Sequence, residues 1–321
     1  MALVSTANMR DDKRLVYHSY RRFLLSVSYP VFSSRNFKFD FQNGISTPNA
    51  SYNQHTNSHR RPPALTTDET YKSNVIAQGL PVDIQDFDGF KLCWLGARDA
   101  KQVIVYTCGG GLIMHAYDAH IINLINGYKV MKGNGQDVAI AILVYGLCPG
   151  APYPTQLRQM VETVQHLLKT RAPETINFSG DSAGGMLINA LLLHHSHTHP
   201  KVEPYTLPAG SRFGQALLVC PGAPVMTQTA SMLQDPNPDI VTQEIVNQMW
   251  GAITSTSEEG VQMPNPWIGS SLAPEEWWKG LPIGEVKIIV GGLEALRDDI
   301  AIWSAFLKVS YPYSYILLSK P

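Results

Sequence analysis

The sequence INFSGDSAGG, residues 176–185, carries the strongest structural signal in this 321-residue chain. A short strand-like run leads into GDSAGG at residues 180–185, and an apolar helix-like run follows. When G-x-S-x-G lies between a strand and a helix, a sharp turn strains the serine backbone, and glycines avoid side-chain clashes around it. Amides at the helix start then face any negative charge that develops on a bound carbonyl oxygen. The pattern predicts that Ser182 is a nucleophile; the alternative is a glycine-rich turn without chemistry.

The sequence on both sides of this motif alternates between strand-like and helix-like runs. Runs rich in Val and Ile predict strands at residues 82–87, 91–95, 103–107, 138–145, 176–179, 216–219, 286–290 and 314–318. Helices are expected over residues 116–131, 154–170, 183–195 and 298–310. This alternation predicts an α/β fold whose mostly parallel sheet is covered by helices on both faces. Asp88-Gly89 is expected to join the first two strands as a hairpin.

The chain is predicted to divide into a peripheral segment and one large domain. Residues 1–65 are expected to be peripheral and partly disordered, because residues 43–63 are rich in Asn, Ser, Thr, His and Pro, although a helix over residues 11–25 fits the pattern. Residues 66–321 carry the alternation, which stops between about residues 222 and 281, where several prolines and four of the six tryptophans gather. We interpret this stretch as a lid insertion that covers the end of the sheet. The alternative is a surface excursion with a few helices.

A glycine loop, YTCGGG at residues 106–111, follows the predicted strand at 103–107. Without side chains, its backbone N–H groups can approach a ligand closely. Such a loop supplies part of the oxyanion hole when a serine elbow is also present. A flexible loop or a phosphate-binding loop is the alternative, but no Lys-Ser/Thr pair follows, which argues against a Walker-type loop.

A carboxylate is expected after a late strand, because the triad order in this architecture is serine, acid, histidine. Glu294, in GGLEALRDD at residues 291–299, lies at that place. Its carboxylate would fix the tautomer of a histidine and stabilise the imidazolium. Asp298 and Asp299 are better suited to capping the next helix.

These segments, together with residues 145–154, resemble the esterase and lipase family related to hormone-sensitive lipase, especially its fungal members. Family members carry H-G-G-G, Y-x-L-A-P-E-x-P-x-P, G-D-S-A-G-G and D-P-L-R-D-like segments; the counterparts here are residues 108–111, 145–154, 180–185 and 294–298. The resemblance implies an α/β-hydrolase fold and a carboxylic-ester hydrolase with Ser182 as nucleophile and Glu294 as acid.

The resemblance also implies an oxyanion hole formed by the amides of Gly109, Gly110 and Ala183. Related fungal hydrolases often serve secondary-metabolite pathways, including toxin biosynthesis, and this implies a similar setting here. The expected partner is a small apolar ester, and neither a cofactor nor a bound metal is expected.

Three positions depart from the family pattern. Cys108 replaces the histidine before the glycines, and Glu294 replaces the usual aspartate. The catalytic histidine of the family lies just beyond the last strand, whereas no histidine follows His199 here, so we expect a C-terminally truncated copy. Without a general base a serine hydroxyl is a weak nucleophile. A catalytically impaired hydrolase-like protein, or an acyl-transfer role in the same pathway, is therefore the alternative.

Other histidines offer two further hypotheses. His115 lies four residues after Gly111 and is a candidate substitute base, although a solvent-facing side chain is the simpler interpretation. His194, His195, His197 and His199 crowd one predicted helix end. Zinc is conceivable from such spacing. We favour a solvated helix terminus, where protonated histidines suit the helix dipole.

Composition limits the partners and the location. The formal net charge is −1, so no global field attracts nucleic acid or an anionic membrane. No apolar run approaches the length that spans a bilayer, and the N-terminus lacks a secretory pattern. Ser319-Lys320-Pro321 departs from the peroxisomal S-K-L signal at its last residue. An intracellular location, in the cytoplasm or the peroxisome, is expected; the sequence indicates no oligomeric state.

Overall fold

The computed structural model describes residues 65–222, 228–234, 239 and 241–310, and the backbone of three further strands. Two of these strands, β1 (Phe37–Asp40) and β2 (Ile45–Pro48), form a separate antiparallel pair. The third, at the C-terminal end, belongs to the main sheet. The helix predicted over residues 11–25 lies outside the described residues.

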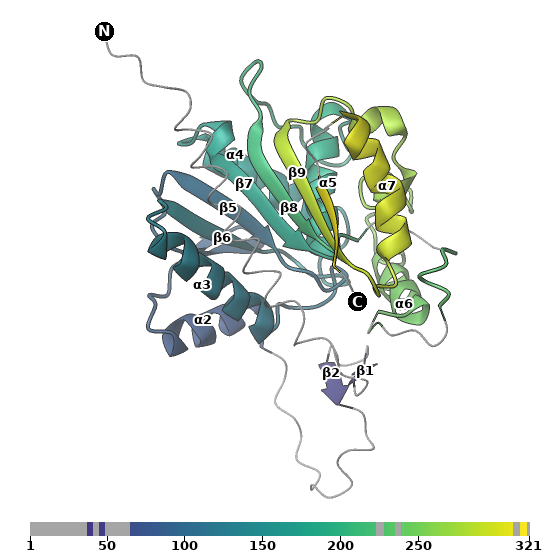
Figure 1. The fold of residues 1–321 in the computed structure, drawn as a ribbon, viewed down its shortest axis with the longest axis horizontal. Helices are drawn as coiled ribbons and strands as arrows, with labels where there is room; N and C mark the ends of the chain where they lie inside the picture. Colours follow the sequence, from purple (N-terminus) through teal and green to yellow (C-terminus); the bar gives the residue numbers. More distant parts are fainter. Residues whose placement is uncertain are drawn as a thin grey trace, which may run out of the picture.

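The described part of the chain builds one eight-stranded sheet with the order β10-β9-β8-β7-β5-β6-β4-β3 (Figure 1). Its strands are β3 (Ile84–Phe87), β4 (Phe90–Leu95), β5 (Gln102–Thr107), β6 (Val138–Val144), β7 (Ile176–Asp181), β8 (Phe213–Val219), β9 (Ile283–Gly291) and β10 (Tyr315–Ser319). The pairs β3–β4 and β4–β6 are antiparallel, and the other neighbours are parallel. The predicted mostly parallel sheet is confirmed, and every predicted strand overlaps an observed one.

The helices are α2 (Thr67–Ala77), α3 (Asp118–Gly133), α4 (Thr155–Leu168), α5 (Ala183–Ser196), α6 (Gln243–Thr254) and α7 (Arg297–Ser310), with short 3₁₀ turns η2 (Pro173–Thr175), η3 (Ser270–Leu272) and η4 (Glu275–Trp278). Strand order places α3 on one face and α4 and α5 on the other, because parallel crossovers are right-handed and the chain moves in opposite directions from β5 to β6 and from β6 to β7. Helices α4 and α5 pack together, as do α2 and α3.

Two helices, α2 and α6, were not predicted. Helix α2 buries only two apolar side chains, Tyr71 and Val75, so its sequence has no apolar periodicity. Its start carries a capping box, in which the Thr66 N–H donates to the Glu69 carboxylate at 2.8 Å. This box was the available signal. Helix α6 lies inside the predicted lid insertion, where the prolines obscured the pattern.

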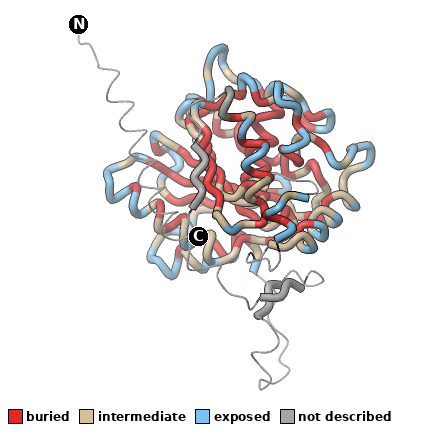
Figure 2. Tube along the Cα trace, turned by 45° about the vertical axis from the view of Figure 1, so that its right-hand side comes forward, coloured by how far each residue is buried: buried red, intermediate tan, exposed pale blue. Residues whose placement is uncertain are grey.

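The inner strands of the sheet form the core (Figure 2). In β6 the six residues from Val138 to Leu143 are all buried, which matches the continuous apolar run expected for a strand covered on both faces. Register aligns the strand ends: Thr107 of β5 lies opposite Gly180 of β7, and Asp181 of β7 lies opposite Val219 of β8. The carboxyl ends of β5, β7 and β8 therefore meet at one edge of the sheet.

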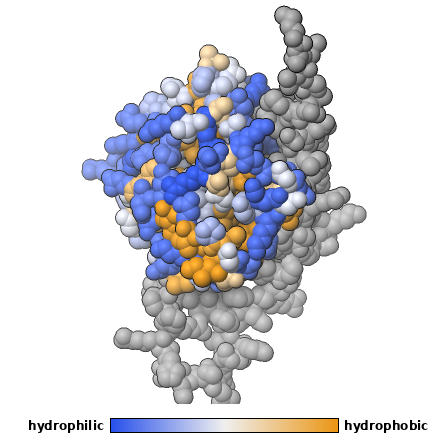
Figure 3. Space-filling view, turned by 90° about the vertical axis from the view of Figure 1, so that its left-hand side faces the viewer, coloured by the Kyte–Doolittle hydropathy of each residue, from blue (hydrophilic) through white to orange (hydrophobic). Residues whose placement is uncertain are grey.

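The face that carries α2 and α3 is largely hydrophilic, with an apolar area low in the view of Figure 3. Exposed apolar side chains on these helices are Ile76, Ile122 and Val130. Exposed apolar residues in such small numbers are ordinary on protein surfaces and indicate no partner.

Candidate active site

Ser182 lies in the sharp turn between β7 and α5. Its backbone has φ 46° and ψ −120°, an uncommon conformation for a residue with a side chain. Two contacts hold the turn, one to the last residue of β8 and one to the segment after it: the Ser182 N–H donates to the Val219 carbonyl at 2.9 Å, and the Gly222 N–H donates to the Ser182 carbonyl at 2.7 Å. The strained elbow that the motif predicts is present.

The glycines around Ser182 allow three chain segments to meet. A Cβ atom on Gly184 would overlap the Thr107 carbonyl oxygen, and one on Gly185 would lie 2.8 Å from the Cβ of Pro221. A Cβ atom on Gly180 would lie 2.8 Å from the backbone of Gly184. These glycines are therefore required because the start of α5 packs directly on the ends of β5 and β8.

The glycine loop after β5 lies against the elbow. A Cβ atom on Gly109 would lie 3.1 Å from the Cβ of Ser182. Gly110 and Gly111 have φ of 116° and 61°, a region that favours glycine. The structure thus brings the glycine loop and Ser182 together, as the sequence indicated.

The Gly109 amide is already engaged, which corrects the expected donor set. Its N–H donates to Asp181 Oδ1 at 3.0 Å and is not free for an oxyanion. Gly110 and Ala183 are the predicted donors that remain. Sequence reasoning missed this because the x position of G-x-S-x-G gives no sign of where its side chain points.

Asp181 is the centre of a partly buried polar network. The Tyr106 hydroxyl donates to Oδ1 at 2.5 Å, and His120 Nε2 lies 3.2 Å from Oδ2. His120 Nδ1 accepts the Tyr117 N–H at 3.0 Å, so the ring proton lies on Nε2 and points at Asp181. Burial raises the pKa of Asp181, but His120 and the hydrogen bonds outweigh burial and hold the pKa below its ordinary value.

Glu294 follows β9 and folds back over the strand end. A Cβ atom on Gly291 would lie 2.7 Å from Glu294 Oε1, so only glycine leaves room for this longer carboxylate. The Cys220 thiol donates to the same oxygen at 2.6 Å. Burial raises the pKa of Glu294 to about 7. Cys220, which contacts Glu294, lies two residues before Gly222, which bonds to Ser182. The loop that carries Glu294 (the acid loop) and the elbow therefore meet at the same edge of the sheet.

A helix from the predicted insertion covers the glycine loop. A Cβ atom on Gly111 would lie 2.6 Å from the Sδ of Met249, which belongs to α6. The insertion therefore places a methionine thioether beside Gly111 of the glycine loop.

The expectation of solvated, protonated histidines at the end of α5 is wrong for His194 and His199. His194 and His199 are 0% and 2% exposed, so they are not solvated. His194 Nε2 lies 3.0 Å from the Glu203 carbonyl, and its Nδ1 accepts the His199 N–H at 2.9 Å. Burial lowers the pKa of His199 to about 4, so neutral histidines stabilise this helix end through hydrogen bonds. The loop after the helix buries them, which the sequence did not reveal.

His115, the candidate substitute base, is engaged at the start of α2. Its Nδ1 accepts the Thr67 N–H at 3.3 Å, and burial lowers its pKa. Among the described residues, no group of three or more His, Cys, Asp or Glu side chains could hold a metal ion.

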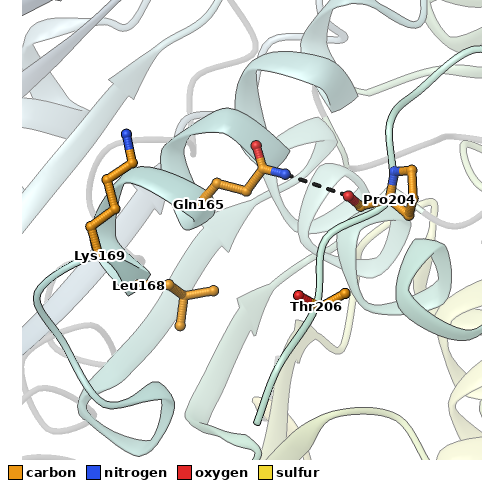
Figure 4. Close-up of a pocket in the computed structure, with 5 residues that line it drawn as sticks. All are labelled: Gln165, Leu168, Lys169, Pro204 and Thr206. Atoms are coloured by element: carbon orange, nitrogen blue, oxygen red, sulfur yellow. Dashed lines mark hydrogen bonds between the residues drawn. The ribbon is translucent and has the colours of Figure 1, made fainter.

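An open pocket of about 260 Å³ lies at the opposite edge of the sheet (Figure 4). It is lined by Gln165, Leu168, Lys169, Pro204 and Thr206. Gln165 Nε2 donates to the Pro204 carbonyl at 3.4 Å across it. The end of α4 and the segment after α5 form this pocket.

Comparison with known proteins identifies the fold family. A family model described as the alpha/beta hydrolase fold matches residues 104–309, which is more than half of the chain. The chain belongs to the α/β-hydrolase family. The elbow at Ser182 and the glycine loop therefore belong to an α/β hydrolase.

Individual relatives are distant. Carboxyl esterase 2 from the fungus Tuber melanosporum is 20% identical, with a TM-score of 0.59 over 75% of this chain and 77% of that one. An esterase from the bacterial hormone-sensitive lipase family is 23% identical, with a TM-score of 0.57 over 81% of this chain and 83% of that one. An alpha/beta hydrolase of Acanthamoeba polyphaga mimivirus is 23% identical over 149 residues, which are 44% of this chain and 41% of the relative. This chain thus matches about two fifths of the viral protein.

None of the helices in the described part of the chain combines the length and the apolar character needed to cross a bilayer.

Proposed function

We propose that this α/β hydrolase cleaves carboxylic esters with Ser182 as its nucleophile. The observation that carries the proposal is the strained serine, φ 46°, held directly beside a glycine loop at the carboxyl edge of the sheet. This arrangement presents a hydroxyl next to backbone donors, which acyl transfer needs.

In the proposed reaction, Ser182 Oγ attacks the ester carbonyl carbon, and the carbonyl oxygen gains negative charge. The amides of Gly110 and Ala183 are assigned as its donors, because Gly109 is bound to Asp181. The alcohol leaves with a proton, an acyl-serine forms, and water hydrolyses it. Glu294 is assigned as the acid that would orient an imidazole between itself and Ser182.

A catalytically impaired hydrolase-like protein is the second candidate. The observation that favours it is that the Cys220 thiol donates to Glu294 Oε1, the carboxylate that would otherwise accept the proton of a triad imidazole. Loss of one triad member removes most of the rate, although the oxyanion hole and binding retain roughly 10³–10⁴-fold over water. An acyl-transfer role uses the same acyl-serine with an acceptor other than water.

A fluorophosphonate probe tests the proposal. Covalent labelling that is present in the wild-type chain and lost in Ser182→Ala supports a competent nucleophile. Folded wild-type protein that does not label favours the impaired form. Release of acid from p-nitrophenyl butyrate, compared with and without an added alcohol or amine acceptor, separates hydrolysis from acyl transfer.

The insertion containing α6 is proposed as the lid of the substrate pocket, supported by the contact between Met249 and Gly111. The likeness to fungal family members extends the proposal to a secondary-metabolite pathway, in which the substrate is an apolar ester intermediate. Deleting the gene and profiling metabolites tests this: the ester should accumulate, and an unchanged profile would contradict the pathway role.

A further inference from the structure

Residues 228–234 and Asp239, which follow β8, contact the loop that carries Glu294. We call these residues the anchoring segment. The residues of this segment that contact the acid loop have small polar or acidic side chains. Their partners are backbone and carboxylate groups in the residues that follow Glu294.

Ser231 is the first anchor, and it is buried. Its Oγ donates to the Ala295 carbonyl at 2.8 Å and accepts the Asp298 N–H at 3.1 Å. Its own N–H donates to Asp298 Oδ2 at 2.8 Å. One serine therefore joins both ends of the turn that links Glu294 to α7. Asp298, expected only to cap this helix, also accepts a bond from the anchoring segment.

Asp239 is the second anchor. Its Oδ2 accepts the Ala295 N–H at 2.8 Å, so it holds the residue directly after the acid. Its Oδ1 accepts the Val241 N–H at 3.2 Å, and Val241 immediately precedes Thr242, the N-cap of α6. The same carboxylate thus contacts the residue after Glu294 and the residue that precedes the N-cap of α6.

Among the described residues, Cys220, Asp239 and Arg297 are the charged or titratable groups nearest to Glu294 in sequence or by contact. Cys220 donates to Oε1 from the end of β8, and Asp239 is the negative group that opposes ionisation of Glu294. Arg297 is directed to Asp298 Oδ1, at 2.8 Å, and to the Gly292 carbonyl, at 2.6 Å.

We propose that Ser231 and Asp239 are positioning residues, which fix the Glu294 loop and link its placement to α6. This proposal rests on the proposed function of the Ser182 and Glu294 site. Its physical basis is that buried hydrogen bonds to backbone groups define one loop conformation, because an unpaired buried group costs free energy. Movement of α6 would therefore change the geometry of the acid, since Asp239 holds both.

The test measures the titration midpoint of the Glu294 carboxyl in the full chain by ¹³C NMR, with Glu294→Gln to assign the resonance. In Asp239→Asn, which keeps an acceptor for the Ala295 N–H but loses the charge, we expect the midpoint to fall by about half a pH unit or more. In Ser231→Ala the loosened loop admits water, and the midpoint should also fall. Glu244→Gln is the matched control, since it removes an exposed carboxylate from the first turn of α6 and should change nothing.

A wild-type midpoint in both folded variants overturns the proposal, as does an equal shift in Glu244→Gln. If Ser231→Ala does not fold, Asp239→Ala, which removes the acceptor of the Ala295 N–H, takes its place. The rate of fluorophosphonate labelling is the second readout and should fall in Ser231→Ala. Absence of wild-type labelling contradicts the proposed function, whereas the titration tests the positioning role independently of turnover.

Discussion

The backbone N–H of Gly109 donates to the carboxylate of Asp181, the residue that immediately precedes Ser182. This hydrogen bond fixes the glycine loop against the elbow. Tyr106 from β5 and His120 from α3 bind the same carboxylate, so three segments meet at one partly buried anion. Asp181 thus sets the spacing between the nucleophile and the loop amides, although it has no proposed contact with the substrate.

Replacement of Asp181 should therefore affect both stability and reactivity. Asp181→Ala leaves the Gly109 N–H, the Tyr106 hydroxyl and His120 without their acceptor, and we expect a loss of about 3–5 kcal/mol in the free energy of unfolding. Asp181→Asn keeps the shape and should lose about 1–3 kcal/mol. Urea unfolding measures both changes.

Labelling of Ser182 by a fluorophosphonate should also slow in the folded Asp181→Asn variant. Asp118→Asn is the control, because Asp118 makes an exposed bond to Asn74, and it should change the unfolding free energy by less than about 0.5 kcal/mol. Equal stability losses at both positions would contradict the network role of Asp181.

The raised pKa of Glu294 makes stability depend on pH. The folded-state pKa is about 7, whereas the ordinary value is 4.5. Between these values the folded chain holds a proton that the unfolded chain has released, so stability falls as pH rises from 4.5 to 7. The full loss above pH 7 is about 3 kcal/mol at about 1.36 kcal/mol per unit.

Glu294→Gln removes this titration. Relative to wild type, the variant should become more stable by about 3 kcal/mol as the pH increases from 4 to 8. Urea denaturation at a series of pH values measures the difference. A difference that does not vary over this range would show that Glu294 ionises in the folded chain with its ordinary pKa.

Local sequence determined the features that depend on local sterics. The elbow at Ser182 and the open backbone at Gly110 were predictable because glycines and a strained serine leave a pattern in consecutive residues. The strands were predictable because a sheet buried on both faces requires continuous apolar runs, as residues 138–143 show. A pattern of this kind is visible without any knowledge of distant contacts.

Contacts between distant residues left no such pattern. His120 and Asp181 are 61 residues apart, and nothing near either residue indicates the pairing. Cys220 and Glu294 are 74 residues apart, and nothing near either residue in the sequence indicates the contact. His194 was misjudged because its burial depends on the loop after α5, whose Glu203 carbonyl binds the ring. Tertiary packing, rather than local propensity, decides these features.

Met249 should limit the size of the ester group that fits beside the glycine loop. Met249→Ala removes the thioether next to Gly111. The ratio of the labelling rate of bulky probes to that of small probes should therefore rise by about tenfold. Met249→Trp should shift the ratio the other way. Second-order labelling rates for fluorophosphonates of short and long alkyl chain measure the selectivity. Gln248→Ala, an exposed neighbour on α6, should leave the ratio unchanged, and an equal effect there would contradict the assignment.

Two glycines make a matched pair for testing the close packing at the elbow. A methyl group at Gly184 would overlap the Thr107 carbonyl oxygen, and the backbone on both sides is fixed, so Gly184→Ala should destabilise the fold by about 3 kcal/mol or more. Gly251 lies inside α6, and a methyl group there would have no neighbouring atom within 4 Å, so Gly251→Ala should stabilise the helix by about 0.5–1 kcal/mol. Thermal and urea unfolding of both variants measure these opposite signs. If Gly184→Ala unfolds at the wild-type midpoint, β5 and the start of α5 are not packed as closely as described, and the contact between the glycine loop and Ser182 would have to be revised with them.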